Sequence, residues 1–130
     1  RIGGFEKAYC CFNSNARDIA RIGKLVLDNG QAFGKQVVGE SYIVNATQPA
    51  NYIVDEDGME NDFYGYHWWL LNYKGTTVKY ARGILGQYIF ILPEYDAVVV
   101  RLGHLRSEEY KDHHPKDVFI YLDTAFEMLD

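Results

Sequence analysis

The sequence has little cysteine, little proline and no long apolar run, and it carries fewer basic than acidic residues. The only two cysteines, Cys10 and Cys11, are adjacent; because a disulfide between neighbours strains the peptide that joins them, we expect free thiols. No stretch approaches the ~18 apolar residues of a membrane-spanning helix, so no membrane span is expected. The 13 basic and 18 acidic residues give a net charge of −5, which argues against a nucleic-acid partner because such partners require clustered basic residues.

No Pro- or Ser-rich linker and no internal repeat divides the 130 residues. The length and the 48% of hydrophobic residues therefore predict a single domain over residues 1–130. The chain starts with Arg1 rather than Met, so we expect either that an upstream part has been removed or that these residues belong to a longer chain.

Helix signals occur at both ends of the chain and once between them. In residues 13–30, Asn15 can cap a helix, Asp18 lies where a carboxylate reaches back, and Gly30 closes the far end. A short helix is expected at residues 41–47. Near the end of the chain, Pro115 fits a first helical position. An apolar stripe that should dock on a sheet follows it: Val118, Phe119, Leu122, Ala125, Phe126 and Leu129.

Four segments are predicted as strands of one antiparallel sheet: residues 64–73, 78–83, 87–92 and 97–102. With the helices that flank it, this sheet predicts an α+β fold. Gly83 and Gly86 lie where a strand interior would carry side chains. Glycine at such positions marks either a β-bulge or a close approach of the backbone to a ligand or catalytic residue.

Four sequence blocks occur in order, namely ARDIARIGKLVLDNG from Ala16, YGYHWW from Tyr64, G-x-x-G-Q-x-I from Gly83 and P-E-x-D-x-V-V-V from Pro93. Together they resemble the C-terminal portion of the β-lactamase-like (penicillin-recognising) serine hydrolases, in the branch of esterases and 6-aminohexanoate-dimer hydrolases. The resemblance implies the C-terminal part of the β-lactamase/transpeptidase-like fold. It also implies a bacterial enzyme that cleaves a small amide or ester through an acyl-serine intermediate, in the periplasm or elsewhere outside the cytoplasm.

The nucleophile motif of that family, Ser-x-x-Lys, is absent, and so is its Tyr-x-Asn or Tyr-x-Ser element. Ser14, Ser41 and Ser107 are followed three residues later by Arg17, Val44 and Tyr110. The resemblance therefore implies a partial domain that needs the N-terminal portion of the same protein as its partner, and an isolated chain without activity.

The resemblance also implies site residues on the strand that ends near Gly83. In the family, the backbone N–H that follows the strand's glycine donates to the oxyanion, which assigns this role to Ile84, with Gly83 keeping the strand open. The substrate-binding candidates beside them are Ala81, Arg82, Gly86 and Gln87. Ala81 replaces the cationic or imidazole residue of penicillin-recognising members, and strand alternation directs Arg82 away from Ala81. We expect neither a metal nor another cofactor.

Other interpretations remain open at this point. Gln87 can cap the local backbone instead of binding substrate, and His113 and His114 can mark the entry to the last helix rather than a metal site. Trp68 and Trp69 are predicted to pack in the core rather than to bind a sugar. For the whole chain, the alternatives are a non-catalytic binding module and a degenerate family member that serves as an interaction domain.

Overall fold

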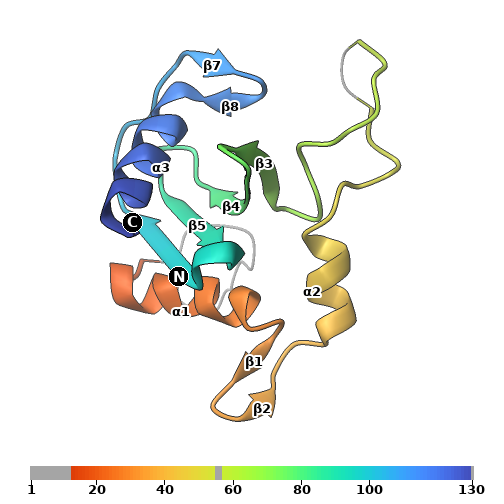
Figure 1. The fold of residues 1–130 in the computed structure, drawn as a ribbon, viewed down its shortest axis with the longest axis vertical. Helices are drawn as coiled ribbons and strands as arrows, with labels where there is room; N and C mark the ends of the chain where they lie inside the picture. Colours follow the sequence, from red (N-terminus) through yellow and green to blue (C-terminus); the bar gives the residue numbers. More distant parts are fainter. Residues whose placement is uncertain (1–12, 55–56, 130) are drawn as a thin grey trace, which may run out of the picture.

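The computed structural model describes residues 13–54 and 57–129. A four-stranded antiparallel sheet lies between helix α1 (Ala16–Leu27) and helix α3 (Lys116–Leu129) (Figure 1). The predicted α+β class is thereby confirmed. Cys10 and Cys11 lie outside the described residues.

The sheet is a meander in which each strand pairs with its neighbour in sequence. Its members are β3 (Trp69–Tyr73), β4 (Thr76–Arg82), β5 (Tyr88–Leu92) and β6 (Ala97–Arg101), in the order β3-β4-β5-β6. Between β5 and β6 the chain turns through a short 3-10 helix (Pro93–Tyr95) and the left-handed Asp96. The predicted Pro93 turn and the last three predicted strands are confirmed to within two residues.

Alternation along the strands gives the sheet two apolar faces. Tyr80, Tyr88 and Phe90 form a cluster with Val118, Leu122 and Phe126 of α3, so the predicted docking of the apolar stripe is confirmed. On the other face, Gly23 of α1 lies so close to Ile89 and Val98 that a Cβ at this position would stand 2.5 Å from a methyl carbon of Val98. The absence of a side chain at Gly23 therefore permits close contact between helix and sheet.

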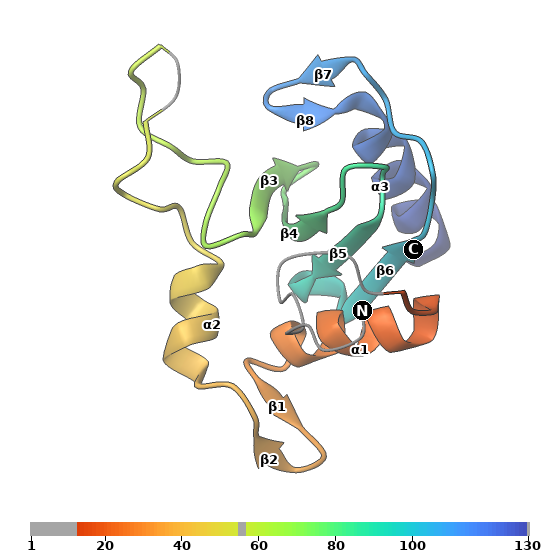
Figure 2. The same ribbon diagram turned by 180° about the vertical axis from the view of Figure 1, so that it is seen from behind.

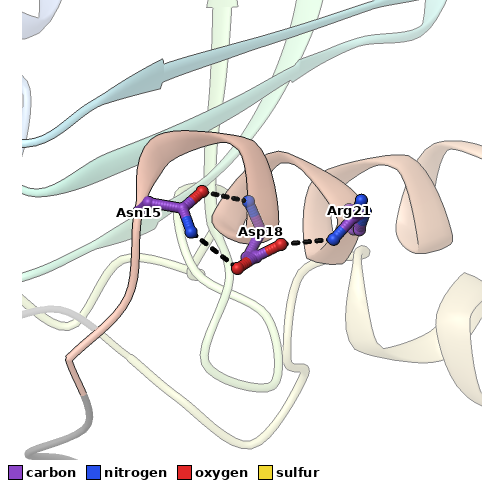
Figure 3. A network of polar contacts seen from close by, with 3 residues as sticks. All are labelled: Asn15, Asp18 and Arg21. Carbon is purple, nitrogen blue, oxygen red and sulfur yellow. Dashed lines mark hydrogen bonds and ion pairs between the residues drawn. The ribbon is translucent and has the colours of Figure 1, made fainter.

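Helix α1 begins where the sequence predicts. The side-chain oxygen of Asn15 accepts a hydrogen bond from the backbone N–H of Asp18 at 3.0 Å, and the Asn15 amide donates to the Asp18 carboxylate at 2.7 Å (Figure 3). The same carboxylate contacts Arg21. At the far end, Gly30 adopts φ +86° and donates its N–H to Leu25 O at 2.7 Å, which closes the helix.

The first predicted strand is only half right. Regular pairing starts at Trp69 rather than at residue 64, and Tyr64 contributes a single bridge to Trp69. Between them the chain turns, because Gly65 donates its N–H to Trp68 O at 2.8 Å and His67 has a φ of 66°. The aromatic composition of residues 64–68 resembles a strand, but this local turn prevents one.

Residues 31–54 and 57–66, here called the lateral segment, lie to one side of the sheet (Figures 1 and 2). They contain the hairpin β1 (Gln31–Ala32) and β2 (Lys35–Gln36) and the predicted short helix, observed as α2 (Glu40–Ala46). Ile43 anchors α2 by packing with Val26 and Ile91. Many large apolar side chains of the segment are nevertheless exposed: Phe33, Val37, Tyr42, Val44, Tyr52, Val54 and Tyr66.

The chain between β6 and α3 contains a last hairpin, β7 (Tyr110–Lys111) and β8 (His114–Pro115). Pro115 ends β8, and α3 starts one residue later than predicted. Among the described helices, none has the length and apolar character needed to cross a membrane.

Candidate functional site

The two glycines singled out by the sequence belong to the turn that joins β4 to β5. Strand β4 ends at Arg82 and β5 begins at Tyr88, and these two residues pair directly. Gly83 donates its N–H to Gln87 O at 2.7 Å, and Gly86 donates to Gly83 O at 3.1 Å. The expected strand interior at Gly83 and Gly86 is wrong, because β4 ends at Arg82 and residues 83–87 connect it to β5. The β-bulge alternative agrees with the structure. The bond from the Gly86 N–H to Gly83 O closes a tight turn at Ile84 and Leu85, and Gly86 follows in the left-handed region, which is the arrangement of a G1 bulge.

Two long side chains hold this turn. Arg101 donates from Nη1 to Gly86 O and, at 2.8 Å, to Leu105 O. Gly86 has a φ of +78°, and a Cβ there would stand 2.2 Å from Arg101 Nη1. Glycine suits this position because the left-handed backbone favours it and because an added Cβ would also stand 2.8 Å from the backbone atom Leu105 O.

The Gln87 side chain also holds the turn, through hydrogen bonds to Leu85 and Gly103. Its Nε2 donates to Gly103 O at 2.9 Å, and its Oε1 accepts from the N–H of Leu85 at 3.2 Å. The side-chain amide thus caps the local backbone, which was the alternative to substrate binding. In the described structure, Gln87 therefore stabilises the turn that contains Ile84.

Ile84 occupies the tip of the turn, with 80% of its surface exposed. Among the described residues, no acceptor is hydrogen-bonded to its backbone N–H. The residue also lines an open pocket of about 380 Å³. The other lining residues are Leu85, Leu105, Arg106, Ser107, Glu108 and Tyr110. A backbone N–H without an acceptor beside a pocket is available to an acceptor on a bound molecule.

Ala81 and Arg82 lie just before the turn. Ala81 pairs with Ile89 in the sheet. The guanidinium carbon of Arg82 stands 3.2 Å from the centroid of the Trp69 ring, and Nη1 donates to His113 O at 3.1 Å. Burial lowers the pKa of Arg82 from its ordinary value. The ring of Trp69 and the carbonyl of His113 therefore hold the Arg82 side chain in place.

The sequence does not predict a buried contact between Tyr80 and His114, which lies beside Arg82. Tyr80 and His114 are almost fully buried, and Tyr80 Oη lies 2.7 Å from His114 Nδ1. Burial raises the pKa of Tyr80, and burial together with the charge of Arg82 lowers the pKa of His114 to about 4. Tyr80 therefore keeps its proton and faces a neutral imidazole, and the His114 tautomer determines which of the two atoms donates. No spacing signal links two residues 34 positions apart. His114 lies in β8, two residues before the first residue of α3, as the helix-entry interpretation expects.

The described residues supply no activated nucleophile. Ser107 lines the pocket, but its hydroxyl donates to Glu109 O at 3.1 Å and accepts from Glu109 N–H at 3.2 Å. Over residues 13–54 and 57–129, no serine hydroxyl is hydrogen-bonded to a lysine, histidine or tyrosine side chain. Nor does this part of the chain contain a group of three or more His, Cys, Asp or Glu residues that could hold a metal ion.

Comparison with known proteins gives two informative matches. The 6-aminohexanoate-dimer hydrolase of Paenarthrobacter ureafaciens is 28% identical over 127 residues, which cover 94% of this chain and 32% of that protein. A solved structure of a putative 6-aminohexanoate-dimer hydrolase from Bacillus anthracis superposes with a TM-score of 0.65 at 23% identity, covering 88% of this chain and 28% of that one. No protein-family model matches the chain.

These matches confirm the resemblance on which the site residues depend. The chain is similar in sequence to a 6-aminohexanoate-dimer hydrolase and has the fold of the solved structure over most of its length. It spans about a third of the length of the curated relative.

Proposed function

From this relationship to β-lactamase-like hydrolases, we propose that the chain forms the oxyanion side of a serine hydrolase site that cleaves an amide or ester through an acyl-serine intermediate. The observation that carries the proposal is the backbone N–H of Ile84, an exposed residue beside the pocket, which has no acceptor among the described residues. A donor of this kind becomes useful when negative charge develops on a substrate carbonyl oxygen.

The geometry of the turn supports this role. An oxyanion donor stabilises a transition state only if it is already oriented, because reorientation during the reaction costs free energy. Here Arg101 and the Gln87 side chain hold Leu85 and Gly86, which follow Ile84, and the bond from the Gly83 N–H to Gln87 O holds the backbone before it. Gly83 leaves the turn without a side chain immediately before the donor. Gly86 and Gln87, expected to bind substrate, are instead proposed to position the donor.

We further propose that the reacting serine and its lysine come from a portion of the hydrolase outside these 130 residues. Two features support a partner of that kind. The relative extends far beyond the region that matches this chain, and the lateral segment exposes Phe33, Tyr52 and Val54 by 96%, 76% and 64%. Exposed apolar side chains gathered on one segment are typical of a surface that another part of a protein covers. The substrate is proposed to be a small amide or ester, as the name of the relative suggests.

The test uses a chimera and the isolated chain side by side. In the chimera, this chain replaces the region of the Paenarthrobacter ureafaciens hydrolase that aligns with it. We expect the chimera to hydrolyse a nitrophenyl ester and to lose that activity on treatment with a serine-directed fluorophosphonate. The isolated chain should hydrolyse the ester no faster than buffer does, because it provides no nucleophile.

Two results would contradict the proposal. The first is fluorophosphonate-sensitive hydrolysis by the isolated chain, since this would place a nucleophile within the 130 residues. The second is a chimera that has a native circular dichroism spectrum and a cooperative unfolding transition but no activity. The second result would favour the non-catalytic binding module, for which the exposed side chains of the lateral segment are the supporting observation.

A further inference from the structure

The β7–β8 hairpin is short and has an unfavourable backbone conformation at its tip. Its two strands form only two residue pairs. The tip residues Asp112 and His113 have φ values of 47° and 67°, in the left-handed region that costs free energy for residues other than glycine. A two-stranded hairpin of this size is marginally stable by itself. Its position therefore depends on contacts with the rest of the protein.

Contacts from strand β4 and from the lateral segment hold the hairpin in place. Tyr80 Oη on β4 lies 2.7 Å from Nδ1 of the buried His114. Two residues further along β4, Arg82 Nη1 donates to His113 O at 3.1 Å. The His113 ring also stacks on the Phe63 ring of the lateral segment, and the two centroids are 3.8 Å apart. Of these contacts, the one that buries His114 depends on the protonation of an imidazole.

The surroundings of His114 favour its neutral form. From β3 and α3 it is faced by the aromatic rings of Trp69 and Phe119. The titratable and charged groups around it lie on β4, in the hairpin and in the lateral segment, namely Tyr80, Arg82, Asp112, His113 and Asp62. Burial and the positive charges of Arg82 and His113 lower the pKa of His114 to about 4, and the two carboxylates offset this only in part. A positively charged imidazole is therefore less stable in this site than in water.

We propose that His114 is a pH-dependent latch for the β7–β8 hairpin, so that its protonation releases residues 110–114 from β4 while the four-stranded sheet and α3 stay folded. Pro115 is fully buried and directly precedes α3, so it provides the fixed end about which the hairpin moves. The released imidazole reaches water, where hydration stabilises its charge and Arg82 no longer repels it. The sheet keeps its pairing without the hairpin, since β4 pairs with β3 and β5.

Release of the hairpin would also change the candidate site. Tyr110 of β7 lines the pocket beside Ile84, so this pocket would lose one wall in acid. A hydrolase with the proposed function would then bind its substrate less tightly in acid than at neutral pH. Only this consequence rests on the proposed function, because the release itself requires neither a substrate nor a catalytic group.

The test measures amide hydrogen exchange in the 130-residue chain, labelled with ¹⁵N, at pH 7 and pH 5. The N–H of Lys116 donates to Glu109 O at 2.9 Å across the base of the hairpin, so its exchange reports release. The N–H groups of the inner strand β5 report unfolding of the sheet. After correction for the intrinsic effect of pH on exchange, the opening equilibrium constant at Lys116 should exceed that of β5 at least about 10-fold at both pH values.

The opening equilibrium constant at Lys116 should also increase about 20-fold from pH 7 to pH 5. In this range the released imidazole, with an ordinary pKa of about 6.5, takes up a proton, whereas the docked imidazole, with a pKa of about 4, does not. The docked hairpin is therefore most stable above about pH 6.5 and less stable as the pH falls towards 4. His114→Asn cannot take up the proton and should abolish the increase. His104→Asn, which alters an exposed histidine outside the hairpin, should retain it.

Three results would overturn the proposal. Equal opening equilibria at Lys116 and in β5 at both pH values would show that the hairpin opens only when the sheet unfolds. An opening equilibrium at Lys116 that is the same at pH 7 and pH 5 would show that no protonation drives release. An increase that persists in His114→Asn would assign it to another group. If His114→Asn does not fold, His114→Gln replaces it, and the first two comparisons need only the unsubstituted chain.

Discussion

The sheet with its two helices and the lateral segment use apolar side chains in opposite ways. In the sheet region, Tyr80, Phe90 and Leu122 are fully buried, and aromatic rings contact one another across the strands. In the lateral segment, Phe33 and Tyr52 are largely exposed. The sheet region buries the apolar side chains between its strands and α3, whereas these side chains of the lateral segment remain in contact with solvent. The candidate site belongs to the first region, whose internal contacts hold the turn at Ile84.

The largest expected difference between the two regions comes from removing one phenylalanine ring from each. Phe90→Ala should lower the free energy of unfolding by about 3–5 kcal/mol, because the ring is buried and its removal leaves a cavity. Phe33→Ala should change it by less than about 0.5 kcal/mol, because 96% of the Phe33 surface is already exposed. Urea unfolding followed by circular dichroism measures both. Similar losses in the two variants would mean that Phe33 is buried in solution, for example by self-association.

The next largest effect is a dependence of stability on pH that arises in the sheet region alone. The pKa of His114 is lowered to about 4, chiefly by burial, so between this value and about 6.5 the unfolded chain binds the proton that the folded chain does not. The folded protein therefore has its full free energy of unfolding, as far as His114 is concerned, above about pH 6.5. As the pH falls towards 4, protonation of His114 in the unfolded chain lowers this free energy by on the order of 2–3 kcal/mol.

Urea unfolding at pH 7 and pH 5 measures this effect. His114→Asn should flatten the dependence on pH, whereas His104→Asn, which alters an exposed histidine, should preserve it. If His114→Asn has the same slope as the unsubstituted chain between pH 5 and pH 7, the imidazole is not held neutral by burial.

A smaller effect tests whether the lateral segment is folded despite its exposure. A Cβ on Gly65 would stand 2.3 Å from Ala46 O and 2.6 Å from Gln48 O. Both oxygens belong to the backbone and cannot easily move away, so Gly65→Ala should lower the free energy of unfolding by about 1–3 kcal/mol. Gly39→Ala, where no atom lies within 4 Å of the added carbon, should stay within about 0.5 kcal/mol. Equal behaviour of the two variants would show that the segment lacks this packing in solution.

The sheet region was also the more predictable of the two. The cap at Asn15, the meander and the docking stripe of α3 follow from signals that lie close together in the sequence, and the structure contains all three. The first strand was overextended because aromatic composition carries no information about the turn at Gly65 and His67. Local signals therefore recovered the elements, but tertiary contacts decided where this strand begins.

For the candidate site, the sequence shows neither that Gly83 and Gly86 lie in a turn nor what holds that turn. The spacing of Gly83 and Gly86 pointed to an unusual backbone, yet the reason for Gly86 is the guanidinium of Arg101, which arrives from another strand. The pairing of Tyr80 with His114 likewise joins β4 to β8 across 34 residues. Contacts of this kind depend on the register and twist of the whole sheet and are not encoded in any short motif.

The central claim, that the backbone N–H of Ile84 is an oxyanion donor, is tested most directly by two substitutions at this residue in the hydrolase chimera. Ile84→Val keeps the N–H and should leave turnover nearly intact. Ile84→Pro removes it and should reduce turnover about 100-fold to 1,000-fold. Since this N–H has no acceptor among the described residues, proline breaks no hydrogen bond of the turn, and circular dichroism checks that the fold persists. A folded Ile84→Pro chimera with near-normal turnover would contradict the account.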